Sequence, residues 1–460
     1  MKSLDTTIAA IATPKGIGGI GIIRISGPLC IAVANDIFRK KDLKAPSLLT
    51  PRKLYNGYII DNEESVMDEV LLAYMKGPNS YTAEDVIEIQ AHAGFYTLKS
   101  ILELVFSKGV VSAQPGEFTK RAFLNGRIDL TQAEAVIDMI NAKTKRSLKV
   151  ALSQIKGKIS LDVTNLRGKI EKILTQFEAV LDFPEDVGDI IDTEKLIETI
   201  EKEIKKQLQS LLDNYENGHI LRDGVKLAIV GVPNVGKSSL MNRLLNKERS
   251  IVTHIPGTTR DVIEEPLNLN GVPVVVSDTA GIHETSDPVE KIGIERTEDA
   301  IDSSDIVLFL VDGTTSYSKK DKHIAERVRD KKTVLVVNKS DLATKESYDV
   351  TGFVKDLPSV HISAKQGDGL SLLKDLINDL VISDLTESDD SAIPNIRHKE
   401  AIEKAISSLE LVVDGLLSEL PFEMVSMDLR DAHGFLGEIL GITERVDILD
   451  NIFSDFCIGK

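Results

Sequence analysis

Two short motifs, about a hundred residues apart, constrain this chain more than any other feature. Residues 231–238 read Gly-Val-Pro-Asn-Val-Gly-Lys-Ser and directly follow the apolar run from Lys226 to Val230. A glycine-rich loop between a strand and a helix presents backbone N–H groups to phosphates. Asn338-Lys339-Ser340-Asp341 comes later, again after an apolar run. This order predicts a Ras-like P-loop α/β domain that binds a guanine nucleotide.

Each polar position of this pattern has an expected partner on the nucleotide. Gly236 lets the backbone wrap the phosphates, Lys237 supplies a positive charge to the β- and γ-phosphates, and Ser238 offers its hydroxyl to magnesium. Asp341 can accept both N1–H and N2–H of guanine, and adenine offers no such pair of donors. An ATPase or kinase is therefore disfavoured. Ser363-Ala364-Lys365, after a strand-like run, would complete the base pocket.

Two segments between these motifs fit the switch regions of such a domain. Residues 257–261 lie where a first switch belongs, and Thr259 is the expected second hydroxyl on magnesium. Asp278 follows the strand expected over 272–277 and would reach magnesium through water, and Gly281 would sense the γ-phosphate. The expected nucleotide contacts are Asn234, Val235, Gly236, Lys237, Ser238, Ser239, Thr253, His254, Ile255, Pro256, Gly257, Thr258, Thr259, Asp278, Thr279, Ala280, Gly281, Asn338, Lys339, Asp341, Ser363, Ala364 and Lys365.

The residue after Gly281 is Ile282, where Ras-like enzymes place a glutamine that orients water. An isoleucine cannot orient water, so hydrolysis needs another carboxylate or amide, another cation or a partner. Asn234, inside the phosphate loop, is a candidate ligand for a monovalent cation. The alternative is that Asn234 is a turn residue, because asparagine favours such loops.

More than half of the 460 residues lie outside this module, which indicates two to four domains. The net charge of −17 argues against non-specific binding to nucleic acid, although a local basic patch or a partner could still hold an RNA. Cys30 and Cys457 are the two cysteines, too few for a disulfide framework, and they favour a reducing, cytoplasmic location. The apolar stretch from Ile8 to Ile11 fits neither a signal peptide nor a membrane span.

The flanks predict a small α/β domain and then helices. Residues 1–118 mix strand-like runs with glycine-rich turns and one helical pattern near 95–107. One-sided apolar stripes with helical spacing occur on both sides of the nucleotide module, and such helices must pair. We expect one bundle built from both flanks, with the module inserted and 383–391 as the return linker; two separate helical domains are the alternative. The expected domains are 1–118, 119–218, 219–384 and 385–460.

Several segments together resemble the MnmE (TrmE) family of tRNA-modifying GTPases, and the resemblance extends over the whole chain. The segments are 5–14 (Asp-Thr-Thr-Ile-Ala-Ala-Ile-Ala-Thr-Pro), 18–27, 115–119 (Pro-Gly-Glu-Phe-Thr), 121–127 (Arg-Ala-Phe-Leu-Asn-Gly-Arg), 132–135 (Gln-Ala-Glu-Ala) and the terminal 456–460 (Phe-Cys-Ile-Gly-Lys). The last five residues are the most distinctive, since generic GTPases of this class lack them.

The resemblance implies an N-terminal domain that binds folate and dimerises, and potassium-stimulated GTP hydrolysis. It also implies a complex with the FAD-dependent partner MnmG (GidA). Together the two would add a carboxymethylaminomethyl or aminomethyl group to C5 of the wobble uridine, position 34, of certain tRNAs. The carbon would come from 5-formyl- or 5,10-methylene-tetrahydrofolate, with glycine or ammonium as the nitrogen source.

Carried over by position, the resemblance assigns ligands and catalytic groups. Ser238 and Thr259 would hold Mg²⁺, and Glu290 would be the general base; without the resemblance Glu290 is a solvated surface glutamate. Cys457 would act near the folate, the alternative being a small buried thiol. K⁺ would be bound by Asn234, Thr258 and the carbonyls of Thr253 and Ile255, and folate by Arg24, Glu88, Arg127 and Lys460.

A regulatory or ribosome-assembly GTPase is the competing hypothesis. Its nucleotide module would look nearly the same, so the flanks must discriminate. Folate binding to residues 1–118 together with the C-terminal tail favours the modification enzyme.

Overall fold

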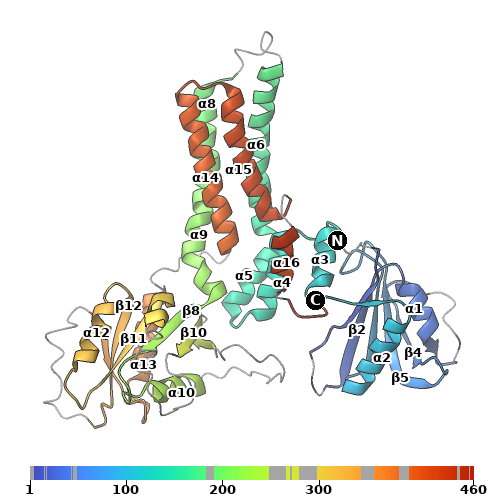
Figure 1. Cartoon of the computed structure of the whole chain (residues 1–460), viewed down its shortest axis with the longest axis horizontal. Helices are drawn as coiled ribbons and strands as arrows, with labels where there is room; N and C mark the ends of the chain where they lie inside the picture. The colour runs from blue at the N-terminus through green and yellow to red at the C-terminus, as the bar shows by residue number, and fades with distance from the viewer. Residues whose placement is uncertain are drawn as a thin grey trace.

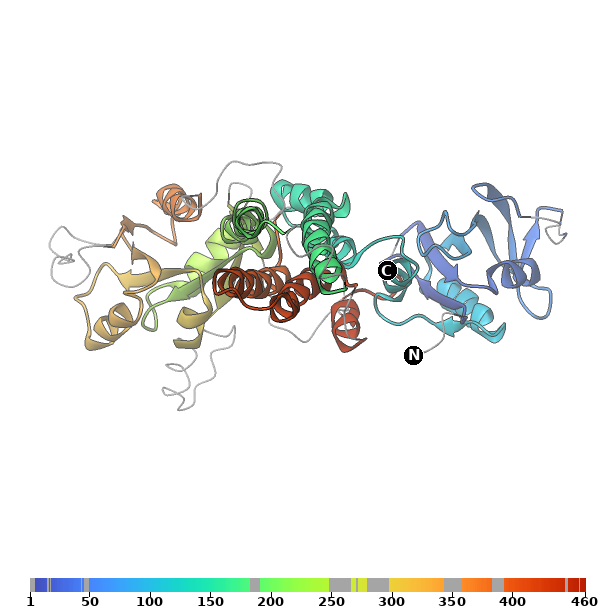
Figure 2. The same ribbon diagram turned by 90° about the horizontal axis from the view of Figure 1, so that it is seen from above.

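The chain folds into three lobes, an upright helical bundle with one α/β lobe on either side of its base (Figure 1). The view from above shows the same three lobes in a row, with the bundle in the middle (Figure 2). The computed structural model describes residues 5–14, 16, 18–42, 44, 49–182, 191–247, 266–269, 272–278, 298–342, 357–382, 393–442, 446–454 and 456–460.

The N-terminal lobe is a single sheet covered by two helices. Its elements are β1 (Ile8–Ile11), β2 (Ile20–Ser26), α1 (Cys30–Ile37), β3 (Phe38–Lys40), β4 (Leu54–Ile60), β5 (Val66–Met75), β6 (Val86–His92), α2 (Phe95–Ser107) and β7 (Val111–Ser112). The strand order is β3-β4-β5-β6-β2-β1-β7, antiparallel except for the β1–β7 pair. Apolar side chains of the sheet and of both helices form one core. The small α/β domain expected at this end is confirmed.

The middle lobe is all helical. Its elements are α3 (Glu117–Leu124), α4 (Leu130–Asn141), α5 (Lys145–Ile155), α6 (Lys158–Asp182), α8 (Thr193–Glu198), the π-helical η1 (Thr199–Lys205), α9 (Lys206–Asp223), α14 (Ile396–Leu417), α15 (Phe422–Leu440) and α16 (Val446–Ser454). One core joins α6, η1 and α9 to α14 and α15, with Leu208 and Leu409 both fully buried in it. The single bundle built from both flanks is confirmed, and the alternative of two separate helical domains is wrong.

Helix α4 belongs to a second, smaller core at the base of the bundle. Leu130 and Ala133 pack with Phe453 and Phe456 from the end of the chain, not with the main bundle core. Ile140, in the last turn of α4, is exposed. The C-terminal segment is therefore held between α4 and the N-terminal lobe, as both views show (Figures 1 and 2).

The third lobe is the predicted Ras-like domain. Its elements are β8 (Val225–Val230), α10 (Lys237–Lys247), β9 (Pro266–Leu269), β10 (Val272–Asp278), β11 (Ile306–Asp312), α12 (Lys319–Arg327), β12 (Lys332–Asn338), β13 (Ser359–His361) and α13 (Leu370–Ile382). The strand order is β13-β12-β11-β8-β10-β9, parallel except for the edge strand β9. Burial on both faces explains the unbroken apolar runs of β8, β11 and β12.

The nucleotide domain joins the bundle at two places. Helix α9 passes into β8 through Gly224 alone, so the expected boundary at 218/219 falls inside α9. The expected boundary at 118/119 likewise falls inside α3. The predicted return linker, 383–391, lies outside the described residues. Within the described part of the chain, no helix is long and apolar enough to cross a membrane.

Candidate functional site

The phosphate loop runs from the end of β8 to the start of α10. Asn234 and Gly236 have left-handed backbones, with φ of 65° and 101°. A Cβ at Gly236 would lie 2.2 Å from Asn338 Nδ2, so only glycine fits there. Lys237 Nζ donates to the carbonyls of Gly231 (2.8 Å) and Val232 (3.0 Å). The loop thus closes around a cationic group, the arrangement that a phosphate requires.

Asn338 connects the phosphate loop to the base-pocket loop. Its Nδ2 donates to the Val235 carbonyl at 2.7 Å, and its Oδ1 accepts from the Ala364 N–H at 3.0 Å. The side chain is buried, and both ends of its amide are satisfied within the protein. Asn338 therefore holds two loops in register, which its sequence motif alone does not reveal.

Lys339 adopts a left-handed backbone, φ 66°, and its Nζ lies 2.5 Å from Asp312 Oδ2 at the end of β11. Partial burial opposes ionisation of Asp312, but hydrogen bonds from Lys339 and Thr314 outweigh it and hold the pKa of that carboxyl below its ordinary value. The ion pair orients the lysine stem along the expected base pocket. The sequence analysis missed Asp312, because no motif marks it.

Asp341 and Lys365 are exposed at the mouth of the same pocket, and Ser363 is fully buried. Ser363 Oγ accepts from the Gln366 N–H at 3.1 Å and shapes the turn. Arg243 of α10 donates to the Gln366 carbonyl at 2.8 Å, so the helix after the phosphate loop also supports the base pocket. The predicted residues of the two motifs are therefore brought together.

Of the other predicted nucleotide contacts, Ser238 and Ser239 lie exposed in the first turn of α10. Asp278 ends β10, but its side chain is outside the described atoms. The predictions that fall wholly outside the described residues concern Thr253, His254, Ile255, Pro256, Gly257, Thr258, Thr259, Thr279, Ala280, Gly281, Ile282 and Glu290.

A second cluster lies where the C-terminal tail meets the N-terminal lobe. Arg24 of β2 donates to Glu88 Oε1 of β6 through Nε (2.9 Å) and Nη2 (2.8 Å). Its Nη1 donates to the carbonyl of Gly459 at 3.3 Å. Two predicted folate residues are thus paired with each other across adjacent strands, and the arginine also binds the end of the chain.

The ring of Tyr81 lies between two arginines that were predicted to bind folate, Arg24 and Arg127. The guanidinium of Arg24 is 5.2 Å from the ring centre, and that of Arg127 is 5.1 Å away. Arg127 also donates to the Tyr81 carbonyl at 3.0 Å and is exposed. Phe118 lies under Arg24 as well, at 5.6 Å. Tyr81 was not singled out in the sequence, since a lone tyrosine carries no motif, and Phe118 entered only as part of the 115–119 segment.

The tail itself is fastened by its backbone. The Phe118 N–H donates to the carbonyl of Lys460 at 3.2 Å, and the Gly116 N–H to that of Cys457 at 3.5 Å. Gly459 has φ 98°, and a Cβ there would lie 2.5 Å from the Ile11 carbonyl oxygen. Lys460 is half-buried, whereas the thiol-bearing Cys457 is exposed. The alternative of a buried Cys457 is therefore wrong; Cys30 is the buried cysteine, and burial raises its pKa to about 12.

Buried Arg121 supports this cluster from below. Its guanidinium donates to the Thr6 carbonyl (2.7 Å), to Glu84 Oε1 (3.1 Å) and to Glu117 Oε1 (3.0 Å). Glu84 also accepts from Ser26 Oγ at 2.6 Å. Arg121 thereby ties α3 to β1 and to the loop that carries Tyr81. Its sequence signal was present in the 121–127 motif, but its role depends on burial that the sequence does not show.

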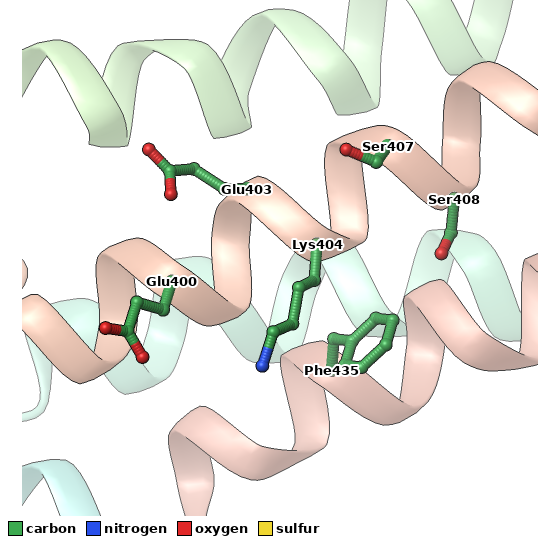
Figure 3. Close-up of a pocket in the computed structure, with 6 residues that line it drawn as sticks. All are labelled: Glu400, Glu403, Lys404, Ser407, Ser408 and Phe435. Atoms are coloured by element: carbon green, nitrogen blue, oxygen red, sulfur yellow. The ribbon is translucent and has the colours of Figure 1, made fainter.

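A hollow of about 400 Å³ on the bundle lies away from both clusters (Figure 3). Lys404 lies over the Phe435 ring at 5.8 Å between α14 and α15, and the two carboxylates are on the α14 surface. These are solvated side chains of a helix surface, and we assign no chemistry to them. The lining residues are Glu400, Glu403, Lys404, Ser407, Ser408 and Phe435.

The fold and the two loops define a P-loop GTPase with helical and N-terminal α/β domains. Family models match residues 7–127 as the N-terminus of the GTP-binding protein TrmE and residues 130–457 as the MnmE helical domain. The chain is 48% identical to the tRNA modification GTPase MnmE of Clostridioides difficile, covering 99% of this chain and all of that protein, and 45% identical to that of Acetivibrio thermocellus over 99% of both. The chain belongs to the MnmE family of tRNA modification GTPases.

Among solved structures, Era of Aquifex aeolicus in complex with GDP.AlF4- is 27% identical over 41% of this chain and 67% of that chain, with a TM-score of 0.27. The two family models and the two relatives confirm, at the level of the family, the resemblance inferred from the sequence motifs. GTP hydrolysis and a part in tRNA modification follow from it.

Proposed function

We propose that the chain is a potassium-stimulated GTPase that acts in the cytoplasm, as a homodimer complexed with FAD-dependent MnmG, on C5 of the wobble uridine of certain tRNAs. The carbon would come from a tetrahydrofolate one-carbon unit. The observation that carries the folate part is the docked C-terminal tail. It brings Arg24, Arg127 and Lys460 to one place beside an exposed Cys457.

The residues of that cluster fit a folate by their chemistry. Exposed Arg127 and half-buried Lys460 can bind the carboxylates of the glutamate tail. Glu88 accepts from Arg24 through Oε1 in both contacts, and a carboxylate there suits the donor edge of a pterin. The folate supplies the one-carbon unit when bound. Arg24 would orient it and hold the tail closed, and Cys457 would act as a positioning or nucleophilic group.

The phosphate loop suits the expected cations in the same way. Ser238 is exposed in the first turn of α10, and exposed Asn234 can offer an amide oxygen from a left-handed turn. Oxygen ligands of this kind suit hard cations. The turn interpretation of Asn234 is correct for its backbone and leaves its side chain suitable for K⁺. Thr258, Thr259 and Glu290 remain predictions for K⁺, Mg²⁺ and the general base.

We propose the domains 1–118, 119–218, 219–384 and 385–460. The ends of α3 and α9 would shift the bounds by a few residues.

Hydrolysis measured in KCl and in NaCl tests the potassium assignment. We expect much faster turnover in KCl, and equal rates would refute it. Glu290→Ala should bind GTP but hydrolyse it far more slowly.

Mass spectrometry of wobble nucleosides from a deletion strain tests the modification itself. Unchanged nucleosides, with no folate bound by the protein, would favour a regulatory GTPase instead.

A further inference from the structure

This acidic chain contains a strongly basic stretch within the helical bundle. The net charge is −17, yet residues 139–161 contain six lysines and arginines and no aspartate or glutamate. All six side chains are exposed. We call this stretch the α5 basic segment; its cations are Lys143, Lys145, Arg146, Lys149, Lys156 and Lys158.

Helix α5 places part of this charge along one face. A helix turns 100° per residue, so Lys145, Lys149 and Lys156 lie within about 40° of one another around its axis. The opposite face, with Ala151 and Gln154, is buried against the rest of the bundle. The lysines therefore project together toward solvent instead of encircling the helix.

Three lysines of the α5 basic segment have no acidic partner among the residues that the structure describes. Lys145, Lys156 and Lys158 form no ion pair with any residue that the structure describes. Lysines elsewhere in the bundle are paired, as in Lys169–Glu203 at 3.0 Å and Lys205–Glu201 at 2.8 Å. Lys145, Lys156 and Lys158 therefore add positive charge to one end of the bundle without a neighbouring carboxylate to offset it.

The α5 basic segment is anchored to the helix that follows Arg127. We call the group formed by Arg24, Tyr81, Arg127 and the C-terminal tail the Arg24–Arg127 cluster. Gln132 Nε2 donates to the Ile155 carbonyl at 2.9 Å, and Thr131 Oγ1 is 2.8 Å from Ser160 Oγ. These bonds hold the end of α5 and the start of α6 against the first turn of α4, which begins three residues after Arg127. Figure 1 shows α4 and α5 at the base of the bundle, between the two α/β lobes.

We infer that the α5 basic segment binds the phosphate backbone of the tRNA substrate and leads the RNA toward the Arg24–Arg127 cluster. The inference rests on the proposed function, in which a tRNA base must reach that cluster. Lysine ammonium groups bind phosphates as point charges and position a nucleic acid without reading its sequence. Because the chain as a whole carries a net charge of −17, a local group of lysines is needed to attract RNA to this part of the surface.

Binding of a tRNA transcript to the full-length protein, measured by fluorescence anisotropy over a series of KCl concentrations, tests this inference. The variant combines Lys145→Gln, Lys156→Gln and Lys158→Gln. Each lost phosphate contact lowers the slope of log affinity against log salt by about 0.7 to 0.9, so three should lower it by about 2 to 3. Affinity at low salt should fall on the order of tenfold or more.

The matched control combines Lys172→Gln, Lys195→Gln and Lys206→Gln, three exposed lysines higher on the bundle, with the same change in charge. It should keep the wild-type affinity and slope, and its GTP hydrolysis should be unchanged. A second variant that combines Lys145→Arg, Lys156→Arg and Lys158→Arg keeps the positive charge and should bind tRNA like the wild type. A purely structural role of the lysines would not predict this. Circular dichroism checks that every variant is folded.

Unchanged tRNA affinity and slope in the glutamine variant would overturn the inference while leaving the proposed function standing. Wild-type protein that binds no tRNA would overturn both. Loss of binding to vesicles of phosphatidylcholine and phosphatidylglycerol, with tRNA binding intact, would assign the segment to a membrane surface and also overturn the inference.

Discussion

The nucleotide loops and the Arg24–Arg127 cluster are built in opposite ways. The nucleotide loops lie within one domain, at the ends of neighbouring parallel strands, and Asn338 joins two of them. The Arg24–Arg127 cluster joins residues from the two ends of the chain, since Arg24 binds the carbonyl of Gly459, 435 residues away. The first needs only its own domain to fold. The Arg24–Arg127 cluster forms only when the bundle holds the C-terminal tail in place. Changes in distant parts of the bundle should therefore affect it.

A buried ion cluster occupies the junction between these two regions. Glu134 of α4 accepts from Arg397 Nε at 2.9 Å and contacts His398 Nε2 at 2.9 Å, where the chain returns from the nucleotide domain into α14. Arg397 also donates to the Glu438 carbonyl of α15 at 2.7 Å. The cluster therefore fixes the start of α14 to α4, the helix that packs against the C-terminal tail. It offers the sharpest test of the difference between the nucleotide loops and the Arg24–Arg127 cluster.

We expect Glu134→Ala to have the largest effect on stability. It leaves buried His398 and half-buried Arg397 without their counter-ion, and removing one member of a buried ion pair costs up to about 3–5 kcal/mol. Urea unfolding followed by circular dichroism should show this loss, and folate binding should weaken with it, while GTP affinity stays near wild type. The control Glu400→Ala, at an exposed position on α14, should change neither property. A Glu134→Ala protein of normal stability would contradict the role of the cluster.

The same carboxylate predicts a pH dependence. Burial opposes ionisation of Glu134, but attraction to His398 and Arg397 outweighs it and holds its pKa well below the ordinary value of 4.5. A depressed pKa adds stability above the unfolded value, and this is lost as the pH falls toward the folded value. The stability gap between wild type and Glu134→Gln should therefore narrow below pH 4.5. A gap independent of pH would rule out the ionised pair.

Gly236→Ala should affect the nucleotide loops alone. The left-handed backbone costs a non-glycine residue about 1–2 kcal/mol, and displacing Asn338 leaves buried polar groups unpaired at about 1–3 kcal/mol. We expect GTP affinity to fall about a hundredfold, with folate binding unchanged, by titration calorimetry. Gly168→Ala, where a Cβ meets nothing within 4 Å, is the control.

Gly459→Ala should weaken folate binding and leave GTP binding unchanged, the reverse of Gly236→Ala. The added Cβ would displace the tail from Ile11 and break the contact with Arg24. Folate affinity should fall about tenfold, given a strain of about 1–2 kcal/mol. GTP affinity should not change. Equal losses of both ligands would mean that the two regions are not independent.

The smallest expected effect is that of Arg243→Ala. It removes the hydrogen bond to the Gln366 carbonyl, worth about 0.5–1.5 kcal/mol. GTP affinity should fall only severalfold and folate binding should be unaffected, again by calorimetry. A loss as large as that of Gly236→Ala would mean that α10 positions the base pocket more strongly than this bond indicates.

The nucleotide domain and the helical stripes could be predicted from the sequence because both depend on local residue patterns. Gly236, Lys237 and Asn338 lie in motifs whose spacing matches a loop geometry. The stripes predicted which helix faces are buried, and one shared core followed. The sequence analysis missed Asp312 and Tyr81, because their roles come from neighbours distant in the chain. It also left open whether Cys457 is buried, which depends on where the tail docks.

The sequence by itself determined that the chain binds a guanine nucleotide, that a small α/β domain and helices flank the nucleotide module, and that the chain resembles one family. These properties follow from residues a few positions apart, whose geometry is set by the local backbone. Only the tertiary structure decided that Arg24 meets Gly459, that Glu134 meets His398 and that the end of α5 packs against the first turn of α4. Such contacts join segments hundreds of residues apart or neighbouring helices, and only packing brings them together.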